Sequence, residues 1–392
     1  MTISDGKIID KNHTRKKELM LYIHIPFCEK KCDYCDFLSA PASGEMKANY
    51  VNKLIQEIKS HKNKKESYKV SSVFIGGGTP SSLPVNLMKD IMVAVKEVFD
   101  LSVLNEITIE VNPGTINRAK LEEYKEAGIN RLSFGLQSTD NKELKSLGRI
   151  HTYETFLENY YLAREVGFHN INIDLMSGLP GQSVEEWLIT LERIIVLKPE
   201  HISAYSLIIE EGTPFYNRYG LDYNNEETDR LIYSKTKEFL QINGYNRYEI
   251  SNYAKDNYEC RHNIGYWKGT EYLGLGLGSS SFLDGIRQKN EEDLNKYLNL
   301  DSDFKELIIE STTLSKKEEM EEFMFLGLRL IKGVSKNNFF LKFNQPIEDI
   351  YNKELLKSEQ ENLLYIGKDS IYLTEKGIDL SNVVMSRFLL DE

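Results

Sequence analysis

Cysteine is scarce in this sequence, which has four cysteines among 392 residues. So few cysteines exclude a fold that is held together mainly by disulfide bonds. No run of 18 apolar residues is present, so we expect no membrane-spanning helix. The first residues also lack the apolar segment of a secretory signal. We therefore expect a cytoplasmic protein.

Positive charge is also in deficit. Lysine and arginine number 49 against 60 aspartates and glutamates, which gives a formal net charge of −11. An acidic chain lacks the broad basic surface that nucleic acids and anionic membranes attract. We therefore expect neither of them as a partner.

What the sequence does contain is an alternation of short apolar runs and amphipathic stretches. Apolar residues make up 41% and charged residues 28%, as in ordinary globular proteins. The apolar, β-branched runs predict strands at 19–25, 72–75, 106–111, 131–136, 170–175 and 201–208. The stretches that follow them predict helices at 45–62, 84–99, 117–127, 152–166, 183–197 and 226–243.

Six alternating units predict an α/β fold in which helices cover a parallel sheet. A closed eight-unit barrel usually takes about 250 residues, whereas the alternation here ends near residue 245. We therefore predict a partial (βα)6 barrel, with an open, doubly wound sheet as the alternative. In both folds ligands gather at the carboxyl ends of the strands.

The composition divides the chain into four parts. Residues 1–18 are polar and predict a flexible tail, and residues 19–245 form the barrel. Residues 246–300 form an aromatic-rich extension with a strand at 272–279. Residues 301–392 have a net charge of −6, which argues against DNA binding, so we interpret this part as a lid or packing domain. Its pattern indicates a winged-helix-like α+β domain, with helices at 316–332, 335–343 and 375–389 and a hairpin at 364–366 and 371–373.

Three of the four cysteines lie together after the first predicted strand, at Cys28, Cys32 and Cys35. Three thiolates on one short loop can bind one inorganic centre. Zinc is the rival interpretation, but a structural zinc site takes four ligands. The other candidates are His24, inside the strand, and Cys260, far along the chain. We therefore predict one 4Fe–4S cluster with three cysteine ligands, which leaves one iron open for a substrate or cofactor.

This cysteine spacing after the first strand resembles that of the radical S-adenosylmethionine (SAM) superfamily. In that superfamily the open iron binds the amino and carboxylate groups of SAM, and the reduced cluster cleaves SAM to methionine and a deoxyadenosyl radical. Two further segments agree with the resemblance. They are Gly76-Gly77-Gly78-Thr79-Pro80 after the second predicted strand and Glu110-Val111-Asn112-Pro113 after the third.

The segments 130–138, 147–151 and 172–182 narrow the resemblance to the coproporphyrinogen-oxidase-like branch of the superfamily. The resemblance implies that ten residues of this chain line the SAM site. They are Tyr22, Tyr34, Gly77, Gly78, Thr79, Glu110, Gln137, Arg149, Asp174 and Ile208.

Two classes of protein share that branch. One is oxygen-independent coproporphyrinogen III oxidase, an enzyme that decarboxylates propionates, and the other is a haem chaperone, which binds and delivers haem. The oxidase motif continues as Cys-x-Cys, whereas here Cys35 is followed by Asp36-Phe37. The segments 248–253, 262–267, 325–330 and 373–377 also resemble the chaperone. We therefore predict a chaperone that transfers haem to an unidentified acceptor protein. The oxidase is the alternative, and a haem-degrading radical SAM enzyme is a third.

Haem is a flat, mostly apolar ligand that needs aromatic walls and an axial donor. The segment His262-Asn263-Ile264-Gly265-Tyr266-Trp267 offers Tyr266 and Trp267 as walls and His262 as the donor. A histidine among aromatic residues is also a common element of ordinary packing. Cys260 or a tyrosine is the next candidate for the axial ligand.

Overall fold

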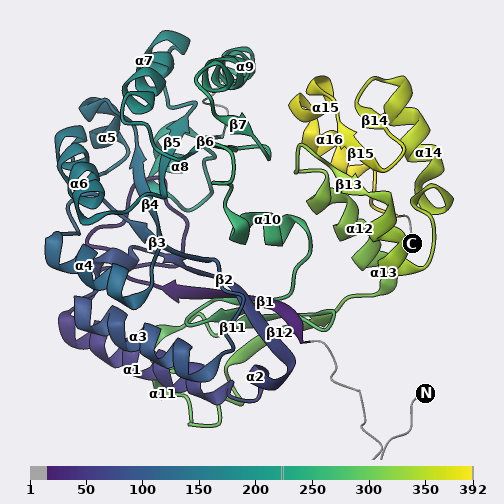
Figure 1. Ribbon diagram of the computed structural model, residues 1–392. Helices are drawn as coiled ribbons and strands as arrows, with labels where there is room; N and C mark the ends of the chain where they lie inside the picture. Colours follow the sequence, from purple (N-terminus) through teal and green to yellow (C-terminus); the bar gives the residue numbers. More distant parts are fainter. Residues whose placement is uncertain (1–15, 222, 224, 391–392) are drawn as a thin grey trace, which may run out of the picture.

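The computed structural model describes residues 16–390, with the exception of residues 222 and 224 (Figure 1). Most of the predicted tail, residues 1–18, lies outside the described residues, and the first strand begins at Lys17. Within the described part of the chain, no helix is long and apolar enough to cross a membrane.

The first six strands of the large sheet are parallel and lie side by side in chain order. A doubly wound sheet would reverse the strand order part-way, so that alternative is wrong and the partial (βα)6 barrel is confirmed. The strands are β1 (Lys17–Ile25), β2 (Tyr68–Gly77), β3 (Glu106–Val111), β4 (Arg131–Gln137), β5 (Ile171–Ser177) and β6 (His201–Ser206).

Helices cover the convex face of this curved sheet (Figure 1). In α7, for example, Ser183 and Glu186 form a capping box at the N-terminus, while Trp187, Leu191 and Ile194 are fully buried. The helices of this part are α1 (Gly44–Ser60), α2 (Lys64–Ser67), η1 (Pro80–Ser82), α3 (Val85–Val98), α4 (Arg118–Ala127), α5 (Asn141–Ser146), α6 (Tyr153–Val166), α7 (Val184–Ile195), α8 (Pro214–Tyr219) and α9 (Glu226–Ile242).

Side chains alternate between the two faces along each strand. On β4, Leu132 and Phe134 belong to the apolar core, whereas Ser133 between them donates a hydrogen bond to Asp174. On β5, Ile173 likewise belongs to the core beside Asp174. The helix-facing positions are therefore apolar and the inward positions polar, which suits a barrel with a polar ligand inside.

The aromatic-rich extension adds strands to both edges of the sheet. The predicted single strand at 272–279 is wrong, because the chain turns at Gly276 (φ +95°) and Gly278 (φ +63°). β9 pairs in parallel with β1, and the later strands continue that edge antiparallel, while β7 and β8 extend the edge at β6. The elements are β7 (Asn246–Arg247), β8 (Asn252–Ala254), α10 (Arg261–Trp267), β9 (Tyr272–Leu275), β10 (Ser280–Leu283) and β11 (Ile286–Asn290).

The large sheet continues past residue 301, where we expected a new domain to begin. α11 (Leu294–Asn299) is followed by β12 (Ile308–Thr313), which pairs with β11. Phe304 and Leu307 lie in the same apolar core as the barrel strands. β12 is mostly exposed, so the sequence has no buried apolar run to indicate it.

The C-terminal part is an α+β unit with its own apolar core. A three-stranded sheet in the order β13-β15-β14 lies among its helices. The predicted helix 316–332 ends at residue 327, the predicted helix 375–389 is two short helices, and α14 was not predicted. The elements are α12 (Lys316–Gly327), β13 (Val334–Ser335), α13 (Lys336–Phe343), α14 (Ile347–Gln360), β14 (Leu364–Ile366), β15 (Ser370–Leu373), α15 (Glu375–Asp379) and α16 (Ser381–Ser386).

Candidate functional site

The cysteine loop leaves the carboxyl end of β1 and closes on itself. The Cys28 N–H donates to the Ala40 carbonyl at 3.1 Å, and the Ala40 N–H donates to the Pro26 carbonyl at 3.0 Å. Cys28 is buried, and Cys32 and Cys35 are partly exposed; all three are free thiols. The loop therefore presents three thiols from a short segment that is held at both ends.

Burial raises the pKa values of Cys32 and Cys35, although the nearby Arg149 guanidinium lowers that of Cys32. Metal binding requires thiolates, so loading of a metal centre at these residues would release protons. Among the residues that the structure describes, no three Cys, His, Asp or Glu side chains lie close enough together to hold a single metal ion. The three thiols instead line one larger cavity.

The glycine run at the end of β2 forms a close wall beside this loop. A Cβ atom on Gly78 would lie 2.7 Å from the Phe27 carbonyl oxygen, and one on Gly77 would lie 2.6 Å from the His24 ring. Gly77 also has φ +114°, a conformation that favours glycine. Only glycine therefore lets the backbone of this wall approach the cysteine loop and the cavity.

Two partly buried carboxyl groups, Glu110 and Asp174, face the same cavity from β3 and β5. Burial and the neighbouring Asp174 raise the pKa of Glu110 to about 8, although the Gly77 N–H donates to Glu110 Oε2 at 3.1 Å. Burial also raises the pKa of Asp174. A ligand that places a positively charged group beside either carboxyl group would favour its ionised form and be attracted to it.

Arg149 and Gln137 complete the polar lining. Arg149 Nη1 donates to Asn112 Oδ1 at 3.1 Å, while its buried Nε has no hydrogen-bond partner within the described structure. Gln137 lies at a bulge between β4 and β5 with φ +76°, a strained conformation for a residue other than glycine. Such strain is typical of ligand sites, and the unpaired Nε could bind a ligand carboxylate.

The cavity has a volume of about 500 Å³, within the range of ligand cavities. The three cysteines and nine of the ten residues that the resemblance assigned to SAM line it. Those nine are Tyr34, Gly77, Gly78, Thr79, Glu110, Gln137, Arg149, Asp174 and Ile208. Tyr22 does not line the cavity; its hydroxyl lies 3.1 Å from His24 Nδ1. The lining offers thiols for a cluster, carboxyl groups for the cationic groups of a ligand, and an arginine for the carboxylate of a ligand. This set of side chains fits a SAM-ligated 4Fe–4S cluster.

The three residues expected to hold haem do not meet in one pocket. His262 is 1% exposed, and its Nδ1 and Nε2 lie 2.9 Å from Ser72 Oγ and 3.1 Å from Tyr266 Oη. Burial lowers the pKa of His262 to about 3. With both ring nitrogens in hydrogen bonds, His262 is not free in this conformation to bind iron. The structure thus places it as a buried packing residue inside the barrel.

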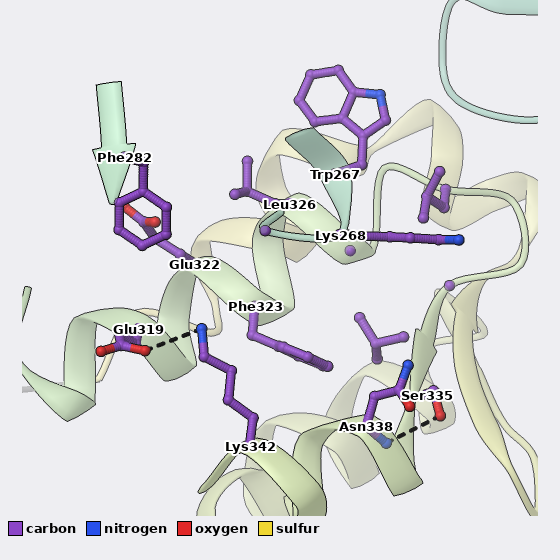
Figure 2. Close-up of a pocket in the computed structure, with 15 residues that line it drawn as sticks. Trp267, Lys268, Phe282, Glu319, Glu322, Phe323, Leu326, Ser335, Asn338 and Lys342 are labelled. Carbon is purple, nitrogen blue, oxygen red and sulfur yellow. Dashed lines mark hydrogen bonds and ion pairs between the residues drawn. The ribbon is translucent and has the colours of Figure 1, made fainter. Parts of the chain in front are cut away.

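Trp267 lies elsewhere, at one end of a groove between α10 and the C-terminal unit (Figure 2). The groove has a volume of about 180 Å³ and apolar walls that include Phe282, Phe323 and Leu326. The guanidinium of Arg329 lies 4.4 Å from the centre of the Trp267 ring. The expected haem walls Tyr266 and Trp267 therefore belong to two different surroundings.

Comparison with known proteins identifies the family. The radical SAM superfamily matches residues 22–194, and the HemN C-terminal domain matches residues 314–380. A Lactococcus lactis protein named "Heme chaperone HemW" is 38% identical over 374 residues, 95% of this chain and 97% of that protein. The Escherichia coli protein of the same name is 34% identical over 386 residues, 95% and 98% of the two chains. This chain belongs to the HemW family.

Membership of the HemW family confirms the predicted branch of the radical SAM superfamily, and with it an iron–sulfur cluster and SAM as the cofactors of the superfamily. The solved structure of Escherichia coli HemN, whose title calls it a coproporphyrinogen III oxidase and a radical SAM enzyme, has the same fold. Its TM-score is 0.82 over 95% of this chain and 90% of that chain, with 24% identical residues.

A polar cluster that the sequence patterns did not indicate holds α10 of this HemW-family chain in place. Glu106 on β3 accepts hydrogen bonds from the Arg261 N–H at 2.9 Å, the His262 N–H at 3.2 Å and the Cys260 thiol at 3.4 Å. The fully buried Arg131 lies near Glu106 and the Cys260 thiol. The signal was an acidic residue at the start of a buried strand, where an apolar residue is usual.

We expect Glu106→Gln to destabilise the protein. The substitution removes a buried negative charge close to Arg131 and replaces one acceptor of the α10 amides with a donor. A loss of about 2–4 kcal/mol in the free energy of unfolding follows from the magnitude of buried charge pairs. Urea denaturation at neutral pH measures it, with the exposed Glu66→Gln as control, expected to change it by less than about 0.5 kcal/mol. Equal stability of both variants would contradict this role of Glu106.

Proposed function

We propose that this protein is a haem chaperone, which binds haem and a SAM-ligated 4Fe–4S cluster and transfers the haem to an acceptor protein. The observation that carries the proposal is the match over nearly the whole chain with relatives named "Heme chaperone HemW". We keep the cytoplasm as its proposed location and an unidentified haem protein as its acceptor.

In this proposal Cys28, Cys32 and Cys35 bind one cluster, and its fourth iron binds SAM. The bound cluster would supply an electron for SAM cleavage. Asp174 and Glu110 would face the positively charged groups of SAM, since both are partly buried carboxyl groups on the cavity wall. The cavity geometry supports the cofactor half of the proposal, while the relatives' names support the haem half.

The α10 segment remains our proposed haem-binding region, with His262, Tyr266 and Trp267. Direct ligation of iron by His262 would require its hydrogen bonds to Ser72 and Tyr266 to break. An absorption band that changes in His262→Ala, and is restored by added imidazole, would support such ligation. An identical band in His262→Ala would leave Cys260 or a tyrosine as the axial candidate.

The experiment that tests the function is anaerobic reconstitution followed by two assays. Iron, sulfide and haem are quantified, and the haem-loaded protein is mixed with apomyoglobin as a general haem acceptor. We expect one haem per chain and transfer of that haem to apomyoglobin. Absence of haem binding would contradict the proposal.

The oxidase remains the second candidate because the fold of HemN extends over 95% of this chain. We expect no conversion of coproporphyrinogen III to protoporphyrinogen IX, although deoxyadenosine from SAM cleavage can form. Phe37 stands where the oxidase motif has its fourth cysteine, and this side chain lies at the cavity with 69% of its surface exposed. Multiple-turnover decarboxylation by the reconstituted protein, measured by chromatography of the porphyrins, would restore the oxidase interpretation.

A further inference from the structure

A line of hydrogen bonds runs from the SAM cavity through the interior of the barrel to α10. Asn172 Nδ2 lies 2.8 Å from Asp174 Oδ1, and Asn172 Oδ1 lies 2.5 Å from His201 Nδ1. His201 Nε2 lies 2.8 Å from Tyr248 Oη, which accepts the backbone N–H of Cys260 at 3.2 Å. Cys260 is the N-cap residue of α10. We call these five residues the interior relay.

The chemistry of the groups assigns one direction to every hydrogen bond of the interior relay. An ionised Asp174 can only accept, so the amide nitrogen of Asn172 faces it and the amide oxygen faces His201. His201 Nδ1 must then carry the proton. Burial lowers the pKa of His201 well below its usual value, so the ring is neutral and Nε2 accepts from the Tyr248 hydroxyl. Each member therefore donates toward Asp174, beginning with the Cys260 N–H.

The middle of the relay is shielded from solvent, whereas Asp174 and Tyr248 are partly exposed. His201 and Cys260 are 0% exposed and Asn172 is 2% exposed. Water cannot readily replace the buried bond between Asn172 and His201, and hydrogen bonds in series polarise one another in a medium of low dielectric constant. A new contact at Asp174 therefore changes the strength of the hydrogen bond at the other end of the relay, between Tyr248 and the N-cap residue Cys260 of α10.

We propose that the interior relay makes the binding of SAM and the binding of haem cooperative. The inference rests on the proposed function, in which SAM contacts Asp174 and haem is bound by the α10 segment. SAM held against Asp174 and haem held against α10 each favour the conformation in which every hydrogen bond of the relay is made. Whichever ligand binds second therefore finds that conformation already favoured. Thermodynamic linkage then requires that SAM increases the affinity for haem by the same factor by which haem increases the affinity for SAM.

The test measures haem affinity by titration of the haem absorption band, with and without saturating SAM. The cluster is reconstituted and kept oxidised, so that SAM is bound and not cleaved. We expect SAM to tighten haem binding about fivefold or more. Haem should tighten SAM binding, measured by equilibrium dialysis of labelled SAM, by the same factor.

Tyr248→Phe removes only the hydroxyl that joins His201 to Cys260. In this variant we expect SAM to increase the affinity for haem by less than about twofold. Tyr245→Phe is the matched control, because this hydroxyl is buried and donates to the Pro199 carbonyl outside the relay. His201→Phe should also abolish the cooperativity. His201→Gln retains a donor and an acceptor and should preserve most of it, which a merely structural role would not explain.

Several results would overturn the inference. Equal haem affinity with and without SAM in the unaltered protein would exclude the cooperativity, while haem binding itself would leave the proposed function standing. Unchanged cooperativity in Tyr248→Phe would exclude the relay as its carrier. No haem binding by the unaltered protein under any condition would overturn the proposed function, and the relay's role with it.

Discussion

Cys32→Ala should lose the brown chromophore of the iron–sulfur cluster. The unaltered protein should hold about four irons and four sulfides per chain after anaerobic reconstitution, because three thiols line one cavity. Removal of the central thiol of the three leaves two ligands on the loop, too few to hold a cubane cluster against loss to solvent. We expect iron to fall below about one per chain, as measured by colorimetric iron and sulfide analysis and by the absorption spectrum.

The fourth cysteine provides the control for this experiment. Cys260 is buried against Glu106 and does not line the cavity, so Cys260→Ala should keep its full iron and sulfide content. If Cys32→Ala retained full iron and sulfide, the ligand assignment would be wrong. If Cys260→Ala lost them, Cys260 would have to contribute to the cluster from a distant element.

Glu110→Gln should make the cofactor-free protein more stable while weakening its binding of SAM. The pKa of Glu110 is raised to about 8 from an ordinary value of 4.5. The folded protein therefore holds a proton that the unfolded chain has lost, so stability decreases as pH rises from 4.5 through 8. Each unit of pKa difference corresponds to about 1.4 kcal/mol, so the gain from Glu110→Gln can reach several kcal/mol above pH 8 and vanishes below about pH 4.5. Thermal unfolding of the cofactor-free protein at several pH values measures the gain.

The binding effect of the same substitution has the opposite sign. A carboxylate that faces a cationic group of SAM contributes a charge-assisted bond, so its loss should weaken SAM binding roughly 10- to 100-fold. In the unaltered protein, SAM affinity should rise with pH as Glu110 loses its proton, and in Glu110→Gln this dependence should be weaker. The exposed Glu122→Gln should change neither property. Unchanged SAM affinity in Glu110→Gln would remove Glu110 from the site.

Local patterns in the sequence account for most of the barrel. The six strand–helix units follow from the spacing of apolar residues, because this spacing indicates whether a segment is a strand or a helix and which of its faces is buried. The site at the cavity is predictable for a related reason. Gly77 and Glu110 lie at the carboxyl ends of the neighbouring parallel strands β2 and β3, and such ends share one edge of the sheet, while Asp174 lies midway along β5.

Elements that depend on partners distant in sequence escaped prediction. β12 is exposed and polar, and only its pairing with β11 makes it a strand. The turn that divides 272–279 is needed because β9 pairs with β1 while β10 runs back beside it. Neither pairing leaves a periodic signal, because strand partners are chosen by the surrounding fold as well as by propensity.

The sequence by itself determined the cysteine loop, the glycine wall and the order of the barrel units, because spacing and periodicity are local properties of a chain. Only the tertiary structure decided that His262 is turned inward and that Glu106 caps α10. Glu106 and Cys260 are 154 residues apart, and they meet because β3 and the start of α10 lie against each other inside the barrel. A buried polar group must find its hydrogen-bond partner wherever the fold places one, and no local pattern records that choice.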